Sequence, residues 1–140
     1  MEPRHVIARR GLASCCVQLG EFDEAIDLLT SHEKVRQDPV AKAWMGHALA
    51  VSGNKTAAEK VVCELLGTQE RRFVPAFHLA VLFAGLRDVD ATFQHLERAC
   101  DWRDPSLDTV GVEPRFNVLR GDRRYQHLLE RLKLEPLAVA

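Results

Sequence analysis

The chain lacks the features that mark membrane, secreted and nucleic-acid-binding proteins. Its 140 residues carry a formal net charge of −1, which gives no long-range field for nucleic acid or an acidic membrane. No run of about 18 apolar residues could form a transmembrane helix. The opening residues 1–5 contain no signal-peptide core. We therefore expect a cytoplasmic protein with neither a membrane nor a nucleic-acid partner.

Cysteine is scarce, and its spacing matches no disulfide framework or metal motif. Cys15 and Cys16 are adjacent, whereas Cys63 and Cys100 lie far away in the chain. The six histidines are scattered and form no zinc-ligand spacing with one another or with the cysteines. The pattern is typical of reduced thiols that pack as small apolar side chains. We expect no bound metal.

Catalytic motifs are also missing. The eight glycines form neither a dinucleotide-binding nor a P-loop pattern. No nucleophile-elbow motif occurs, and no acid/base or nucleophile constellation can be assembled from the sequence. The sequence therefore predicts a protein that is not an enzyme and that has no cofactor.

A helical-hairpin turn recurs three times. The turns centre on Gly20, Gly53 and Arg87, which gives a period of about 34 residues. Each is followed five positions later by a small residue, namely Ala25, Ala58 and Thr92. A small side chain there lets two helices approach closely. Glycine suits the left-handed residue that ends a helix, so Arg87 should cost some stability in the third turn.

Hydrophobic periodicity and turn signals predict an all-α fold. The predicted helices are 4–19, 22–35, 39–52, 55–66, 72–86 and 89–101. Pro75 is expected in the first turn of its helix. After Pro105 the period breaks, with residues 106–113 irregular. A last amphipathic helix is expected over 122–132, because Tyr125, Leu128, Leu129 and Leu132 form an apolar stripe.

The apolar pattern resembles that of the tetratricopeptide family. The family places large, small and large residues on the first helix of each repeat. The matching residues are Leu12, Ala13 and Cys16; Met45, Gly46 and Leu49; Leu79, Ala80 and Phe83. The resemblance implies a right-handed α-superhelix of three helical hairpins with a C-terminal cap. It implies one domain over 1–140, with repeat one at 6–38, repeat two at 39–72, repeat three at 73–106 and the cap at 107–134.

The tail is similar to a C-terminal ending of bacterial multidomain tetratricopeptide proteins. The matching residues are Pro114, Arg115, Phe116, Leu119, Arg120, Asp122, Arg124, Tyr125, Leu128, Leu129, Arg131 and Leu132. In that group the ending closes repeat regions attached to regulators, kinases or cyclases. One hypothesis is therefore a regulatory or oligomerisation segment of a larger bacterial transcription or signalling protein.

The other hypothesis is a protein-interaction scaffold, because the family resemblance implies a concave groove lined by the first helices. The candidate groove residues are Arg10, Ser14, Gln18, Val40, Ala43, His47, Val74, Phe77 and Val81. This surface is mostly apolar, which favours a partner helix or apolar segment anchored near Phe77. Alternatively, some of these side chains pack between neighbouring repeats.

The N-terminal face of the array raises a separate possibility. The first predicted helix begins almost at Met1, with no polar capping helix before it. We expect either a piece of a longer protein or a face that another copy covers, so self-association through this face is possible.

Overall fold

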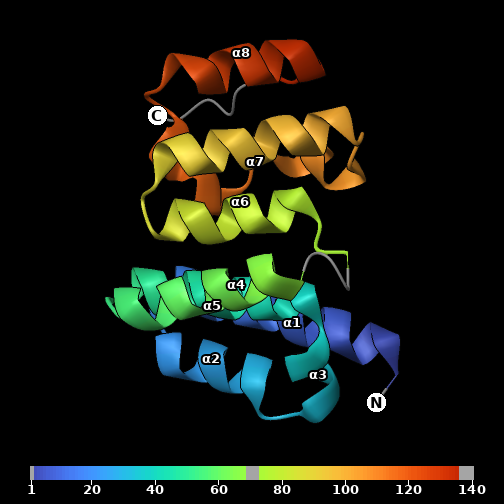
Figure 1. Cartoon of the computed structure of the whole chain (residues 1–140), viewed down its shortest axis with the longest axis vertical. Helices are drawn as coiled ribbons and strands as arrows, with labels where there is room; N and C mark the ends of the chain where they lie inside the picture. The colour runs from blue at the N-terminus through green and yellow to red at the C-terminus, as the bar shows by residue number, and fades with distance from the viewer. Residues whose placement is uncertain (1, 69–72, 136–140) are drawn as a thin grey trace.

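The computed structural model describes residues 2–68 and 73–135, and within these ranges it is helical with no strand (Figure 1). This confirms the all-α class. The α-helices are α1 Pro3–Gln18, α2 Phe22–Thr30, α3 Glu33–Gln37, α4 Pro39–Val51, α5 Lys55–Thr68, α6 Ala76–Gly85, α7 Val89–Asp101 and α8 Arg123–Leu132. Two 3-10 helices, η1 Pro105–Thr109 and η2 Pro114–Leu119, join α7 to α8.

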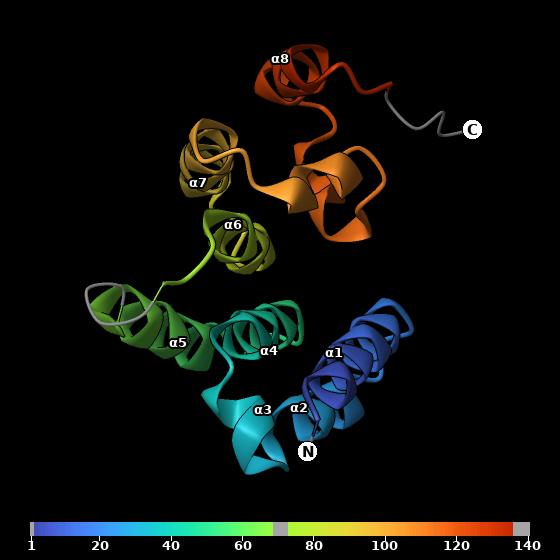
Figure 2. The same cartoon turned by 90° about the vertical axis from the view of Figure 1, so that its right-hand side faces the viewer.

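The helices form hairpins that follow one another along a curved path. Helices α1 and α2, α4 and α5, and α6 and α7 pack as pairs, while α2 and α6 pack on opposite sides of α4. Figure 2 shows α1, α4 and α6 along the inner side of the curve, with the orange segment of η1 and η2 also on that side. The inner side is therefore built from the first helix of each hairpin.

Five helices in the described part of the chain end with the same turn. In each, a backbone N–H donates to the carbonyl five positions earlier, as Glu21 does to Cys16 and Asp88 does to Phe83. This is the Schellman motif, which needs a left-handed residue at its corner. The corner residues are Gly20, Gly53, Arg87, Arg103 and Lys133. The glycine predictions are confirmed, and Arg87 adopts the left-handed conformation itself, with φ at 58°.

The repeat period continues beyond Pro105, contrary to the prediction. Asn54, Asp88 and Asp122 follow one another at one full period each, and each side chain accepts a hydrogen bond from a backbone N–H at the start of the next helix. Helix α8 therefore takes the place of α7 one period later, with η2 before it in place of a full first helix. Residues 106–113 are partly ordered as η1, because Asp104 caps that turn by accepting from the Ser106 N–H.

Two predicted helix boundaries are wrong. The helix expected over 22–35 ends at Thr30, and α3 starts after the extended residue His32, whose Nδ1 accepts from the Lys34 N–H. This break turns Val35 into the core. Helix α6 begins at Ala76, and Pro75 lies just before the first turn because its ψ of 132° is outside the helical range. The predicted start at residue 72 lies outside the described residues.

Two long polar side chains, Arg9 of α1 and Lys42 of α4, brace the first two hairpins. Arg9 donates to the Leu28 carbonyl and to the Ser31 hydroxyl at the end of α2. Lys42 forms an ion pair with Glu64 of α5. These long side chains connect the two helices of each hairpin through polar contacts.

The core of the described chain has three buried clusters, and one side chain touches all of them. The first joins α6, α7 and the C-terminal elements, the second joins α1 to α4, and the third joins α4, α5 and α6. Half-buried Trp44 packs against each cluster. Its place on α4 makes it the hub between the N-terminal hairpin and the C-terminal cap.

Candidate functional site

The inner face is filled at its C-terminal end by the chain itself. Phe116 of η2 is fully buried and packs edge-on against Phe77, with the ring centroids 5.4 Å apart. Phe77 is 2% exposed. A partner therefore has no access to Phe77 in this structure, and the aromatic anchor expected there serves the core instead.

The structure separates the nine candidate groove residues into three groups. The buried residues are Ala43, His47, Val74, Phe77 and Val81; the half-buried residues are Arg10, Ser14 and Val40; Gln18 is exposed. Burial of the first group agrees with the alternative prediction, that some of these side chains pack between neighbouring helices and are not available to a partner. Of the nine residues, Gln18 and His47 line the hollow that remains open on the inner face.

Two guanidinium groups contact the Trp44 ring. The Cζ of Arg115, from η2, lies 4.0 Å from the ring centroid, and that of Arg10, from α1, lies 5.6 Å away. Arg115 is bound by both carboxylate oxygens of Glu113, and Arg10 forms an ion pair with Asp38. Cation–π contacts and paired carboxylates allow these charges to be buried. The inner face is therefore more polar and more tightly built than the sequence predicts.

His47, which is buried, and His78, which is half-buried, complete this cluster in neutral form. The pKa values of His47 and His78 are both lowered to about 4. Burial is the main cause, and the positive charge of Arg115 also contributes. The indole Nε1–H of Trp44 donates to His78 Nδ1 at 3.0 Å, so the His78 proton resides on Nε2. His47 Nδ1 lies 2.9 Å from the Val81 carbonyl, so it carries the proton and donates. Both bonds join residues that are one repeat period apart.

A hollow of about 240 Å³ remains on the inner face. Its walls come from α1, α4, α6 and η2, and include Gln18, His47, Arg87, Arg115 and Val118. Arg87 and Arg115 therefore contribute polar groups to the lining beside apolar side chains such as Val118. The apolar groove predicted from the first helices is thus reduced to a small mixed surface.

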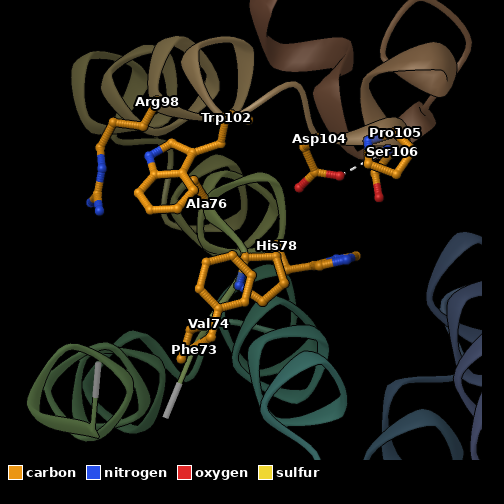
Figure 3. Close-up of a pocket in the computed structure, with 11 residues that line it drawn as sticks. Phe73, Val74, Ala76, His78, Arg98, Trp102, Asp104, Pro105 and Ser106 are labelled. Atoms are coloured by element: carbon orange, nitrogen blue, oxygen red, sulfur yellow. Dashed lines mark hydrogen bonds between the residues drawn. The ribbon is translucent and has the colours of Figure 1, made fainter. Parts of the chain in front are cut away.

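A larger pocket, of about 600 Å³, lies where α6 begins and α7 ends (Figure 3). Phe73 and Trp102 flank it, with ring centroids 6.0 Å apart and a tilt of 42° between the ring planes. Both side chains are exposed, at 67% and 71%. Two large aromatic rings held together in water at the edge of a cavity are the feature expected of a binding surface.

Polar groups stand on opposite sides of this aromatic pocket. Figure 3 shows Arg98 on the side of Trp102, and Asp104 with Ser106 on the other side. One Asp104 oxygen accepts from the Ser106 N–H at 2.9 Å, which holds the carboxylate in place. Val74 contributes to the wall, and it is the only candidate groove residue that lines this pocket among the described residues. The pocket can accept an apolar group between polar contacts of both signs.

Sequence reasoning missed Phe73 and Trp102 because neither occupies a concave repeat position. The sequence feature that could have identified these two residues is their position at predicted helix ends. Phe73 directly precedes the Val74-Pro75 entry to α6, and Trp102 is the C-cap of α7. Large aromatic side chains at the ends of helices have no interhelical space to fill.

The described part of the chain contains one group with metal-ligand spacing, made of Cys16, Glu21 and Glu24. Burial, followed by the charges of Glu24 and Glu21, raises the pKa of the Cys16 thiol, which favours the protonated form that does not bind metal. No helix among the described residues is long and apolar enough to cross a membrane.

Comparisons with known proteins give no relative from which a site could be transferred. A scan against protein-family models, a search of the curated proteins and a search of the solved structures found no significant match to the chain.

Proposed function

We propose that the chain is a non-catalytic scaffold of the tetratricopeptide type that binds an apolar segment of a partner protein in its aromatic pocket. The family assignment is supported by the turns at Gly20, Gly53 and Arg87 and by their identical hydrogen bonding. It is also supported by the helix caps at Asn54, Asp88 and Asp122, which follow one another at intervals of one period. Arrays of helical hairpins present extended surfaces to other proteins.

The observation that carries the proposal is the exposed pair Phe73 and Trp102. Aromatic side chains in pockets supply a large part of the energy in protein interfaces. Elsewhere in the described chain, phenylalanines on the inner face are covered, as Phe77 is by Phe116. The exposed aromatic rings of the pocket are therefore the expected contact residues, and an apolar side chain of the partner would pack against the Phe73–Trp102 pair.

The charges at the rim favour a peptide over a small charged molecule. Arg98 offers a cation on one side, and Asp104 offers an anion on the other. A peptide backbone carries both a donor and an acceptor at every residue. It can therefore use both rim groups while its side chain fills the apolar floor formed by Val74, Pro75 and Ala76.

The test is selection of binders from a displayed library of random peptides, followed by affinity measurement for the best peptide. Trp102→Ala should weaken its binding about tenfold or more, because an anchor of this kind contributes ~2 kcal/mol. Val51→Ala, at a 41% exposed position in the inner hollow, is the matched control and should bind as the parent does.

The result that would contradict this placement is the reverse pattern. A peptide weakened by Val51→Ala and unaffected by Trp102→Ala would move the binding site to the inner hollow. Both variants change solvent-exposed side chains, so circular dichroism should show that each remains helical before affinity is compared. A library that yields no peptide dependent on the folded chain would remove the peptide-binding proposal.

The second candidate function is an oligomerisation segment of a larger bacterial regulatory protein. A specific observation favours it, namely the exposed apolar side chains of α1. Ile7, Leu12 and Leu19 are exposed by 59%, 53% and 74%. Oligomeric state, measured on this chain, tests that candidate directly.

A further inference from the structure

Helix α1 is apolar on two sides, and only one side is used within the described chain. Ala13 and Cys16 are buried against the second cluster of the core. Ala8, Leu12, Cys15 and Leu19 are exposed and form a second apolar stripe. A helix at the surface of a globular protein normally buries one apolar stripe and presents polar residues elsewhere. The second apolar stripe therefore indicates a contact with another molecule.

The spacing of the exposed stripe specifies a helix as that partner. His5, Ala8, Leu12, Cys15 and Leu19 follow one another in alternating steps of three and four along the sequence. This alternation is the seam of a two-helix coiled-coil contact. The small side chains of Ala8 and Cys15 would let another helix approach, and the two leucines would supply the apolar contact.

In the other two hairpins, the residue that corresponds to Leu12 is covered by a neighbouring helix. Leu79 of α6 occupies the repeat position of Leu12, and it is fully buried where α6 packs on its neighbours. Met45 of α4, at the same position, is half-buried and packs against the core cluster that includes the preceding hairpin. Leu12 is 53% exposed because no described element lies against it.

The charges along this face are complementary to the same face turned end to end. Arg4 is exposed near the start of α1, and no acidic residue lies between Pro3 and Gln18. Glu21 and Glu24 are exposed just beyond its C-terminal end. At 1.5 Å per residue, Arg4 lies about 12 Å before Leu12 along the axis, and α1 ends at Gln18 about 9 Å after Leu12, with Glu21 in the turn beyond that end. An antiparallel copy centred on Leu12 would bring each Arg4 beside the partner's acidic end.

We propose that two copies of this chain pair through α1, antiparallel and about a two-fold axis at Leu12. The apolar stripes supply the contact, and the basic and acidic ends fix the direction. Helix dipoles of opposite sense add to this preference. Arg4 already bonds Glu2 of its own chain in an exposed pair, which is easily exchanged for Glu21 of the other copy because exposed pairs are weak.

The outer face of α8 is charged, with Arg123, Glu130 and Arg131 exposed, so it offers no apolar partner for a head-to-tail chain.

The first experiment measures mass in solution by analytical ultracentrifugation over a wide concentration range. An interface of one helix from each copy is small, so we expect a dimer with a dissociation constant of about micromolar. Leu12→Glu should raise that constant at least about tenfold, because it places a charge at the centre of the contact. Leu66→Glu is the matched control, since Leu66 on α5 is also an exposed leucine (41%), and it should dimerise as the parent does.

The second experiment locates the contact and its direction with the native cysteines. Cys15 and Cys63 are exposed and Cys16 is buried. In the antiparallel pair the two copies of Cys15 lie on either side of the axis, too far apart for a disulfide but within reach of a short bismaleimide. Cross-linking should therefore persist in Cys63→Ser and disappear in Cys15→Ser. A direct Cys15 disulfide under mild oxidation would indicate parallel helices and overturn the proposed direction.

The third experiment tests the charge register. Arg4→Glu should weaken the dimer, and adding Glu21→Arg in the same chain should restore it, because the two-fold axis pairs these positions across copies. Failure of the double variant to regain affinity would contradict the register. A monomer at all concentrations, cross-linking through Cys63, or equal loss in Leu12→Glu and Leu66→Glu would overturn the proposal. Peptide binding at Trp102 is measured separately, so either result stands without the other.

Discussion

The guanidinium of Arg115 lies 4.0 Å from the centroid of the Trp44 ring, and this contact joins the C-terminal cap to the middle hairpin. The Arg115 side chain is 5% exposed, and Glu113 binds it through both carboxylate oxygens. The hydrogen bonds and charge of Arg115 lower the pKa of Glu113 against the opposing effect of burial. A cation buried so deeply is stable only while both partners remain.

Arg115→Ala should therefore destabilise the fold strongly. The change leaves the nearly buried Glu113 carboxylate without its partner and removes the cation from Trp44. We expect a loss of about 3 kcal/mol in the free energy of unfolding, measured from the urea midpoint. Arg4→Ala breaks a pair whose side chains are 80% and 59% exposed and should leave the midpoint unchanged. Equal small effects in both variants would show that the Arg115 contact does not stabilise the fold.

Stability should fall in mildly acidic solution because of His47 and His78. Their folded pKa of about 4 lies below the ordinary value of 6.5, so the fold favours the neutral ring. The stabilisation is complete above pH 6.5 and is lost as pH falls towards 4, since the unfolded chain takes up protons first. At about pH 5 we expect a loss of about 2 kcal/mol for each histidine relative to neutral solution.

Urea titrations between neutral pH and about pH 5 give the slope of stability against pH, above the range in which carboxylates dominate. His78→Gln should reduce that slope, and His47→Gln should do the same, while His95, whose pKa burial also lowers, contributes the remainder. The slope, not the absolute stability, is the readout, because either change also removes a hydrogen bond. A slope that neither substitution alters would assign the acid sensitivity to other groups.

Phe116→Ala tests whether the cap is an integral part of the core. Phe116 is fully buried against Phe77, so its removal leaves a cavity at the centre of the first cluster. We expect a loss of about 4 kcal/mol, read from chemical unfolding. Val118→Ala, two positions along the same 3-10 helix and 37% exposed, should lose less than about 1 kcal/mol. A small effect at Phe116 would mean that η2 sits loosely in the groove.

Arg87→Gly should stabilise the protein, because position 87 is a left-handed corner occupied by a residue with a Cβ. Its φ of 58° costs an L-residue ~1 kcal/mol that glycine does not pay. We expect a gain of about 0.5 to 1 kcal/mol in the thermal unfolding curve. Arg98→Gly, inside α7, should lose about 1 kcal/mol from helix propensity. A loss at both positions would mean that Arg87 has contacts worth more than the strain.

Local patterns along the chain determined the helices, their period and many of their ends. Gly20 and Gly53 adopt the left-handed corner predicted for them, and Ala25, Ala58 and Thr92 are fully buried at the hairpin crossings. The stripe of Tyr125, Leu128 and Leu129 faces the core on α8 as predicted. Each of these outcomes depends on residues within a few positions of one another, so periodicity and turn chemistry are sufficient to predict them.

Tertiary packing decided which surfaces are open. Phe77 is covered because Phe116, from the later element η2, reaches the same space, and Trp44 is held between arginines from α1 and η2. Phe73 and Trp102 meet because α6 begins where α7 ends. No local pattern encodes these contacts, since they depend on how distant segments fold back on one another. The sequence by itself determined the repeating helices, and the return of η2 to the inner face decided that the groove closes while the aromatic pocket stays exposed.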